Sequence, residues 1–129
     1  MDRRRQRDFM GLDDRRRTQI VIRRGDIHAV HLDPARGSEA NKRRPAVIVS
    51  NDAANKHLNR LQVIPLTTNV DRVYPSEACV MVRGKQHKAM ADQLTTVSKA
   101  RLDNRLGRLS EGDLKGVEQA IRVQLSLTT

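Results

Sequence analysis

Aromatic residues are almost absent from this sequence, and cysteines and long apolar runs are equally scarce. Phe9 and Tyr74 are the only aromatic side chains in 129 residues, which excludes the platform of several rings on which single-strand binders commonly stack bases. Cys79 is the only cysteine, so no intramolecular disulfide can form, and we interpret its thiol as a small buried hydrophobic group. No segment approaches the roughly 20 apolar residues of a membrane span, and no apolar leader opens the chain. A soluble cytoplasmic protein is expected.

Acidic residues are also in short supply. The chain carries 25 Lys and Arg against 15 Asp and Glu, a net charge of +10. This excess predicts attraction to polyanions, nucleic acid first and acidic protein segments second. Residues 1–19 are rich in arginine and too poor in apolar groups to form a core, so we expect a flexible basic extension followed by one domain over residues 20–129.

Histidine is too sparse for a metal centre. His28 and His31 stand three residues apart in a predicted strand, where such positions face opposite sides, and no cysteine or third histidine lies at ligand spacing. We interpret both as residues flanking a strand surface. No metal ion or other cofactor is expected.

Short apolar runs of β type fill most of the chain. They predict strands at residues 20–22, 26–32, 46–49, 61–67, 77–82 and 91–97. The run at 46–49 is apolar at every position, which predicts a central strand buried on both faces. Pro65 places the strand at 61–67 at an edge or a bulge. Asn51 and the residues after it are typical of a turn or the start of a short helix.

The last third of the chain changes to a helical period. Ser110 offers an N-cap with a capping-box carboxylate, and apolar residues then recur at helical spacing at Leu114, Val117, Ala120, Ile121 and Leu125. Leu102, Leu106 and Leu109 favour a shorter helix or turn before this point. The sequence therefore predicts a mainly β domain with a C-terminal α-helix.

A basic polar loop precedes the apolar strand at 46–49. Gly37 permits a sharp turn, and Pro45 forces Arg44 into an extended conformation, which fixes where the Arg44 side chain leaves the backbone. Arg43 adds a second cation, so the loop suits an anion site. A second candidate phosphate patch is the basic turn around Lys85, and the strand at 91–97 could bring Asp92 and Gln93 to the same mouth. The residues alone leave open whether Arg44 binds an anion or is a surface charge.

Several segments, taken in order, carry a resemblance to a known family. They are Arg24-Gly25-Asp26-Ile27, Leu32-Asp33-Pro34-Ala35-Arg36-Gly37-Ser38-Glu39, Arg44-Pro45-Ala46-Val47-Ile48-Val49-Ser50-Asn51-Asp52, Ile64-Pro65-Leu66-Thr67, Asp92-Gln93-Leu94-Thr95-Thr96 and Arg105-Leu106-Gly107-Arg108-Leu109-Ser110. Over about residues 22–127 these segments resemble the MazF/PemK family of toxin endoribonucleases. Their consistent order is far more specific than any one short motif. Thr95 departs from the family pattern, which often has arginine there.

The resemblance implies a small twisted antiparallel β-barrel of the SH3-like, CcdB–PemK type with a C-terminal helix. It implies a homodimer that cuts single-stranded RNA without a metal ion and is held in check by an acidic, MazE-like antitoxin. The catalytic arginine of the family falls on Arg44 and its catalytic threonine on Thr67. Further residues expected to bind RNA are Gly37, Ser38, Glu39, Arg43, Asn69, Lys85, Asp92 and Gln93.

The chemistry of RNA cleavage explains these residue types. When the 2′-hydroxyl attacks the phosphate, negative charge grows on a crowded phosphorane that a guanidinium fork can hold. The nucleophile belongs to the substrate, so DNA should resist cleavage. Two alternatives remain open at this point: a CcdB-like toxin that binds DNA gyrase, and a nucleic-acid-binding module without catalysis.

Overall fold

The computed structural model describes residues 21–32 and 42–128. Within these ranges the chain forms strands, two α-helices and two 3-10 turns. In chain order they are β1 (Asp26–Val30), β2 (Arg44–Ile48), α3 (Asp52–His57), β3 (Arg60–Thr67), β4 (Glu77–Val82), β5 (Lys85–Met90), η2 (Ala91–Gln93), β6 (Thr95–Ser98), η3 (Lys99–Arg101), β7 (Leu102–Arg108) and α4 (Glu111–Leu125).

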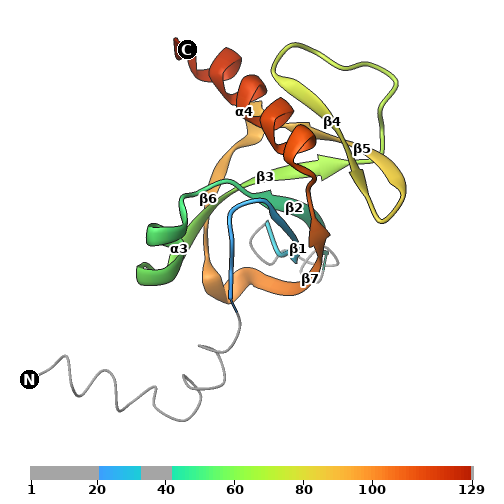
Figure 1. Cartoon of the computed structure of the whole chain (residues 1–129). Helices are drawn as coiled ribbons and strands as arrows, with labels where there is room; N and C mark the ends of the chain where they lie inside the picture. The colour runs from blue at the N-terminus through green and yellow to red at the C-terminus, as the bar shows by residue number, and fades with distance from the viewer. Residues whose placement is uncertain (1–20, 33–41, 129) are drawn as a thin grey trace, which may run out of the picture.

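The strands form one antiparallel sheet in the order β4-β5-β3-β2-β1-β7, and β6 pairs with the first half of β3. Figure 1 shows the sheet strongly curled, with α4 lying beside β4. The prediction of a mainly β fold with a twisted antiparallel sheet and a C-terminal helix is confirmed. No helix among the described residues is long and apolar enough to cross a membrane.

The curl of the sheet encloses apolar side chains on both of its faces. Along β2, Val47 packs into a cluster shared with α4, while Ala46 and Ile48 pack into a second cluster with Leu61 and Val97. The three β2 side chains have no solvent exposure. The prediction of a central strand buried on both faces is therefore confirmed for residues 46–48, whereas Val49 follows β2 and is half-buried.

Pro65 had predicted that the strand at 61–67 lies at an edge or a bulge, and of these two the edge is excluded, because β3 lies inside the sheet. It pairs with β2 along one side, and on the other side with β6 up to Val63 and with β5 from Leu66. Pro65 lies in the gap between these two partner strands. The missing N–H of Pro65 costs little there, because neither β5 nor β6 pairs with this residue.

Three other predicted elements are corrected. Val21 and Ile22 are not in a strand, since the chain turns at Gly25 and β1 starts only at Asp26. Residues 91–93 form the turn η2 before β6, so the predicted strand starts four residues late. Residues 102–108 form β7 instead of a helix or turn. Pairing with β1 overrides the leucine spacing there, at the cost of two register shifts.

The terminal helix α4 begins as expected but is anchored differently. The Ser110 hydroxyl accepts a hydrogen bond from the N–H of Asp113 at 3.1 Å, as an N-cap should. The Asp113 carboxylate does not complete a capping box; it accepts the N–H of Met81 at 3.0 Å on β4. Val117 and Ala120 are buried as predicted, whereas Leu125 is 49% exposed near the helix end.

Two single-residue predictions are wrong. Cys79 is exposed, because it alternates with the inward-facing Ala78 and Val80 along β4. His28 is buried on β1 instead of flanking a strand surface, and its Nδ1 lies 3.0 Å from the carbonyl oxygen of Asp103. The prediction for residues 1–19 lies outside the described residues.

Candidate active site

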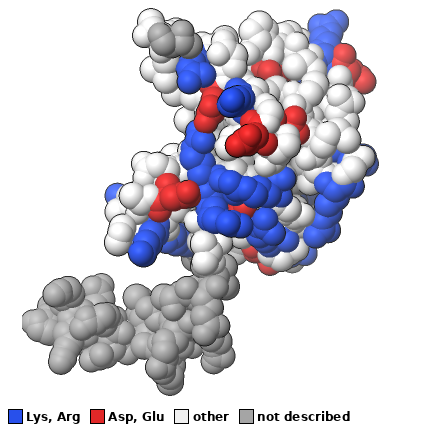
Figure 2. Space-filling model, viewed as in Figure 1, with Lys and Arg blue, Asp and Glu red and all other residues white. Residues whose placement is uncertain are grey.

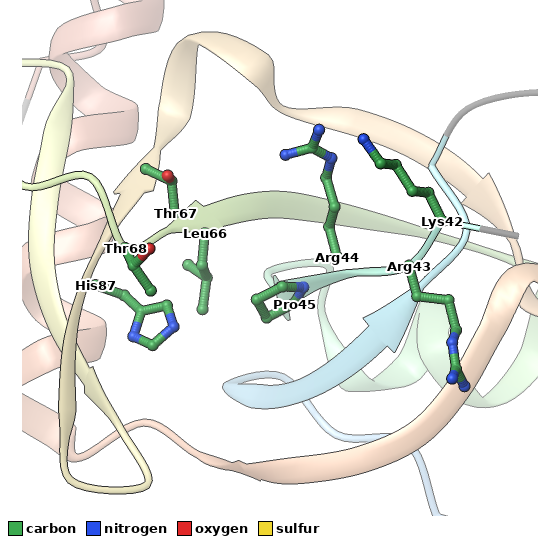
Figure 3. A pocket seen from close by; sticks show the side chains of 8 residues that line it. All are labelled: Lys42, Arg43, Arg44, Pro45, Leu66, Thr67, Thr68 and His87. Atoms are coloured by element: carbon green, nitrogen blue, oxygen red, sulfur yellow. The ribbon is translucent and has the colours of Figure 1, made fainter. Parts of the chain in front are cut away.

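Arg44 and Thr67 lie at the adjacent ends of two neighbouring strands. The paired residues of β2 and β3 end with Ala46 opposite Pro65. Extended by two residues, the same register places the first residue of β2 opposite the last residue of β3. Those residues are Arg44 and Thr67, and directly opposite residues of an antiparallel pair share one face of the sheet. Figure 3 shows both side chains on the same side of β3.

The two ends line a shallow pocket of about 320 Å³. Its lining residues are Lys42, Arg43, Arg44, Pro45, Leu66, Thr67, Thr68 and His87. Three of the eight are cations and none is a carboxylate. Among the described residues, the pocket therefore has the charge of an anion site.

The adjacent arginines Arg43 and Arg44 have different partners. Arg43 points away from Arg44 (Figure 3), and its guanidinium lies 2.6 Å from the Asp103 carboxylate. That hydrogen bond lowers the pKa of Asp103 below its usual 3.8. The exposed Arg44 has no hydrogen bond or ion pair to any residue within 21–32 or 42–128. None of the described residues occupies its guanidinium fork, which can therefore hold an anion.

The hydroxyl of Thr67 accepts a hydrogen bond from the loop that follows it. Its oxygen accepts the N–H of Asn69 at 3.2 Å, so its own proton remains available to donate. The Asn69 side chain is used in turn to accept the N–H of Asp71 at 3.3 Å. β3 ends at Thr67, so Thr68 no longer follows the strand alternation, and both threonines line the pocket.

A nearly buried ion pair stabilises the loop that follows Thr67. Lys88, which is opposite Thr67 in the β3–β5 register, lies 3.0 Å from Glu77 and donates to the carbonyl oxygen of Arg72 at 2.6 Å. Glu77 also accepts the N–H of Tyr74 at 2.9 Å. Burial alone would raise the pKa of Glu77, but the hydrogen bonds from Tyr74 and Lys88 outweigh it and lower that pKa. The charge of Lys88 is thereby neutralised within the protein.

A second group of arginines surrounds one buried carboxylate. Asp26 has no exposure, and Arg23, Arg105 and Arg108 lie 3.9, 3.4 and 2.9 Å from its oxygens. Figure 2 shows Lys and Arg side chains gathered in this part of the surface, below α4. One carboxylate faces three guanidinium groups here, so the surface carries a net positive charge beyond the pocket.

The structure separates the predicted site residues into three groups. Arg43, Arg44 and Thr67 line the pocket, and Asn69 shapes the loop next to it. Lys85, at the start of β5, does not line the pocket. Asp92 and Gln93 do not line it either, because η2 packs against α4 instead of continuing a strand. The predicted residues Gly37, Ser38 and Glu39 lie outside the described residues.

Sequence reasoning missed Lys42, Thr68 and His87 as pocket residues. The charge and position of Lys42, two residues before Arg44, were a usable signal. His87 had been placed in the basic turn around Lys85, the second candidate phosphate patch, but only Arg83 and Gly84 form that turn, both with positive φ, and His87 lies within β5. Nothing in the sequence pairs β5 with β3, so the approach of His87 to the pocket could not be predicted.

Comparison with known proteins identifies the family. Residues 23–125 match the family model described as PemK-like, MazF-like toxin of type II toxin–antitoxin system. The endoribonuclease MazF9 of Mycobacterium tuberculosis is 42% identical over 116 residues, which cover 83% of this chain and 98% of the relative. The endoribonuclease MazF of Staphylococcus epidermidis is 32% identical over 114 residues, covering 83% and 93%.

A solved structure shows the same fold. A mycobacterial endoribonuclease in complex with its cognate antitoxin superposes with a TM-score of 0.70 at 24% identity, over 83% of this chain and 97% of that one. The family model spans most of the chain, and both sequence relatives are matched along nearly their full length. This chain belongs to the family of PemK-like, MazF-like toxins of type II toxin–antitoxin systems.

Proposed function

We propose that this chain is the toxin of a type II toxin–antitoxin pair and that it cleaves single-stranded RNA at the pocket between β2 and β3. The observation that carries the proposal is that Arg44, which has no partner among the described residues, and Thr67 line one pocket at the ends of paired strands. Family membership and two relatives named endoribonucleases support the activity.

The chemistry assigns different parts to the two residues. The 2′-oxygen of the RNA loses its proton and bonds to phosphorus, the bond to the 5′-oxygen breaks, and that oxygen takes up a proton. The products are a 2′,3′-cyclic phosphate and a 5′-hydroxyl. Arg44 stabilises the extra negative charge on the phosphorane through paired N–H donors, and Thr67 donates to a third oxygen. Arg44 is the charge stabiliser, because a guanidinium is too weak an acid to supply the proton readily.

The remaining pocket residues serve substrate binding. Lys42 is exposed at the pocket rim and contributes a positive charge for a neighbouring phosphate. Arg43 acts mainly by fixing the start of β2 to Asp103. Gly37, Ser38, Glu39 and Asn69 are retained as proposed RNA-binding residues. Any contacts of Lys85, Asp92 and Gln93 are with nucleotides farther from the cleaved phosphate.

The partners follow from charge and family. Residues 20–129 hold 18 basic and 11 acidic side chains, so an acidic antitoxin segment is attracted to them over a long range. A homodimer is the assembly expected for the family. The cytoplasm, where mRNA is translated, is the proposed site of action.

The test is incubation of the full chain with a long unstructured RNA and its DNA counterpart in EDTA. We expect discrete cuts with cyclic-phosphate ends on RNA and none on DNA, because DNA lacks the nucleophile. Arg44→Ala should lower the cleavage rate by about 100-fold or more, the scale of losing one transition-state donor. Arg60→Ala, which removes an exposed arginine from the far end of β3, is the matched charge control.

Intact RNA with folded, antitoxin-free protein would contradict the endoribonuclease. Inhibition of DNA gyrase by that protein would then establish the CcdB-like alternative. Salt-dependent binding of RNA and DNA alike, without products, would establish a binding module.

A further inference from the structure

The pocket has a second half that faces away from the guanidinium of Arg44. Neighbouring residues of a strand point to opposite faces, so Pro45 and Leu66 lie on the other side of the sheet from Arg44 and Thr67. Figure 3 shows Pro45, Leu66 and the His87 ring together on that side, with Thr68 between His87 and Thr67. This half is lined mainly by apolar atoms and one imidazole.

His87 presents a defined hydrogen-bonding edge to this half. The side chain is 7% exposed, and its Nδ1 lies 3.0 Å from the carbonyl oxygen of Lys85. A carbonyl oxygen can only accept, so Nδ1 carries the hydrogen, and the neutral ring has its lone pair on Nε2. The ring is directed from β5 toward Leu66 and Pro45 (Figure 3), which places that lone pair in the pocket.

Apolar side chains with one hydrogen-bond acceptor favour some classes of ligand over others. A phosphate is disfavoured, because its oxygens would meet the Nε2 lone pair and the carbons of Pro45 and Leu66. A flat heterocycle with an N–H on its edge satisfies both the apolar side chains and the acceptor. The sequence has only two aromatic residues, Phe9 and Tyr74, and Tyr74 does not line the pocket. Among the described residues that line the pocket, His87 therefore has the only planar ring.

We propose that His87, with Pro45 and Leu66, forms a nucleobase subsite next to the phosphate held by Arg44 and Thr67. Its Nε2 accepts an N–H of the base, which makes His87 a specificity-determining residue. The inference rests on the proposed endoribonuclease function, because it assumes that RNA crosses the ends of β2 and β3. An RNA strand that crosses there places its phosphate on the side of Arg44 and its base on the side of His87.

The first experiment measures binding without cleavage. Full-length protein labelled with ¹⁵N is titrated with a 2′-O-methyl RNA oligonucleotide, which lacks the nucleophile, and the four histidine side chains are followed by NMR. We expect the Nε2 resonance of His87 to shift, while that of exposed His57 stays in place. The His87→Phe variant assigns the signal by its loss. An unchanged His87 signal with bound oligonucleotide would overturn the subsite.

The second experiment measures cleavage preference on an RNA library randomised around the cut. His87→Phe keeps a ring and removes both nitrogens, so we expect the preference at one position adjacent to the cut to fall by about tenfold, the scale of one hydrogen bond. His87→Ala should also raise KM, and His57→Phe should change neither. An unchanged preference in folded His87→Phe would reject the inference while leaving the endoribonuclease intact. Failure of the proposed function itself would appear separately, as absence of any cuts by the unmodified chain.

Discussion

Arg43 and Arg44 are adjacent in the sequence but differ in their partners. Both precede Pro45 in the same basic stretch; Arg43 lies just before β2 and Arg44 is its first residue. One is bound to Asp103, and the other has no partner among the residues that the structure describes. The family resemblance predicted Arg44, the arginine before proline, as the site residue, whereas the residues alone left open whether it binds an anion. The partner of Arg43 could not be predicted, because Asp103 is 60 residues away in the sequence.

Thr67 should be sensitive to loss of its hydroxyl and tolerant of loss of its methyl group. Thr67→Val removes the donor to the phosphorane and the acceptor for the N–H of Asn69, and should lower kcat by about 10- to 100-fold, the range for a hydrogen bond to a charged group. Thr67→Ser keeps the hydroxyl and should retain most of the rate. Single-turnover cleavage measures both, and Thr96→Val on exposed β6 is the control. Equal rates in Thr67→Val and the unmodified protein would remove Thr67 from the site.

Glu77 should make folding stability depend on acid pH. Its pKa in the folded chain lies below the usual 4.5, so the unfolded chain binds more protons as the pH falls. The stability from the Lys88 pair is therefore complete above that value and is lost as the pH falls through the lowered pKa of Glu77. Urea unfolding at several pH values measures this slope. Glu77→Gln should flatten it, and an identical slope in that variant would contradict the role of the pair.

At the scale of elements, the apolar pattern predicted most strands, but it did not predict which strands are neighbours. The buried run of β2 and the period of α4 were readable, because burial on two faces and a helical stripe each leave a local pattern. β7 was not readable, since its leucine spacing favours a helix and only pairing with β1 makes it a strand. The pocket combines β2, β3 and β5, so its cationic half was foreseen and its His87 half was not.

The link between α4 and β4 is an element-scale prediction. Asp113→Ala removes the acceptor for the N–H of Met81 on the outer strand, and should lower the free energy of unfolding by about 1 kcal/mol. Asp113→Asn keeps an acceptor oxygen and should retain much of the stability. Urea denaturation compares the two variants. Equal losses in both would assign the effect to the negative charge near the helix N-terminus instead of to the link.

For the whole molecule, charge should dominate the strength of RNA binding. The net charge of +10 and the arginines around Asp26 extend the positive surface beyond the pocket. The logarithm of the binding constant for a non-cleavable RNA should fall linearly with the logarithm of salt concentration, with a slope of about −0.7 per phosphate contacted. Fluorescence anisotropy in a salt series measures it. Replacing Arg105 and Arg108 together should reduce the slope, and an unchanged slope would confine RNA contacts to the pocket.

The position of β3 between three partner strands has a consequence for the newly made chain. Arg44 and Thr67 are synthesised early, but one side of β3 is completed only by β5 and β6, which come later. Until residues 85–98 have left the ribosome, β3 has an open side, and Glu77 has no lysine to hold the loop after Thr67. Residues 85–98 must therefore be available before the chain can complete the strands that hold the pocket.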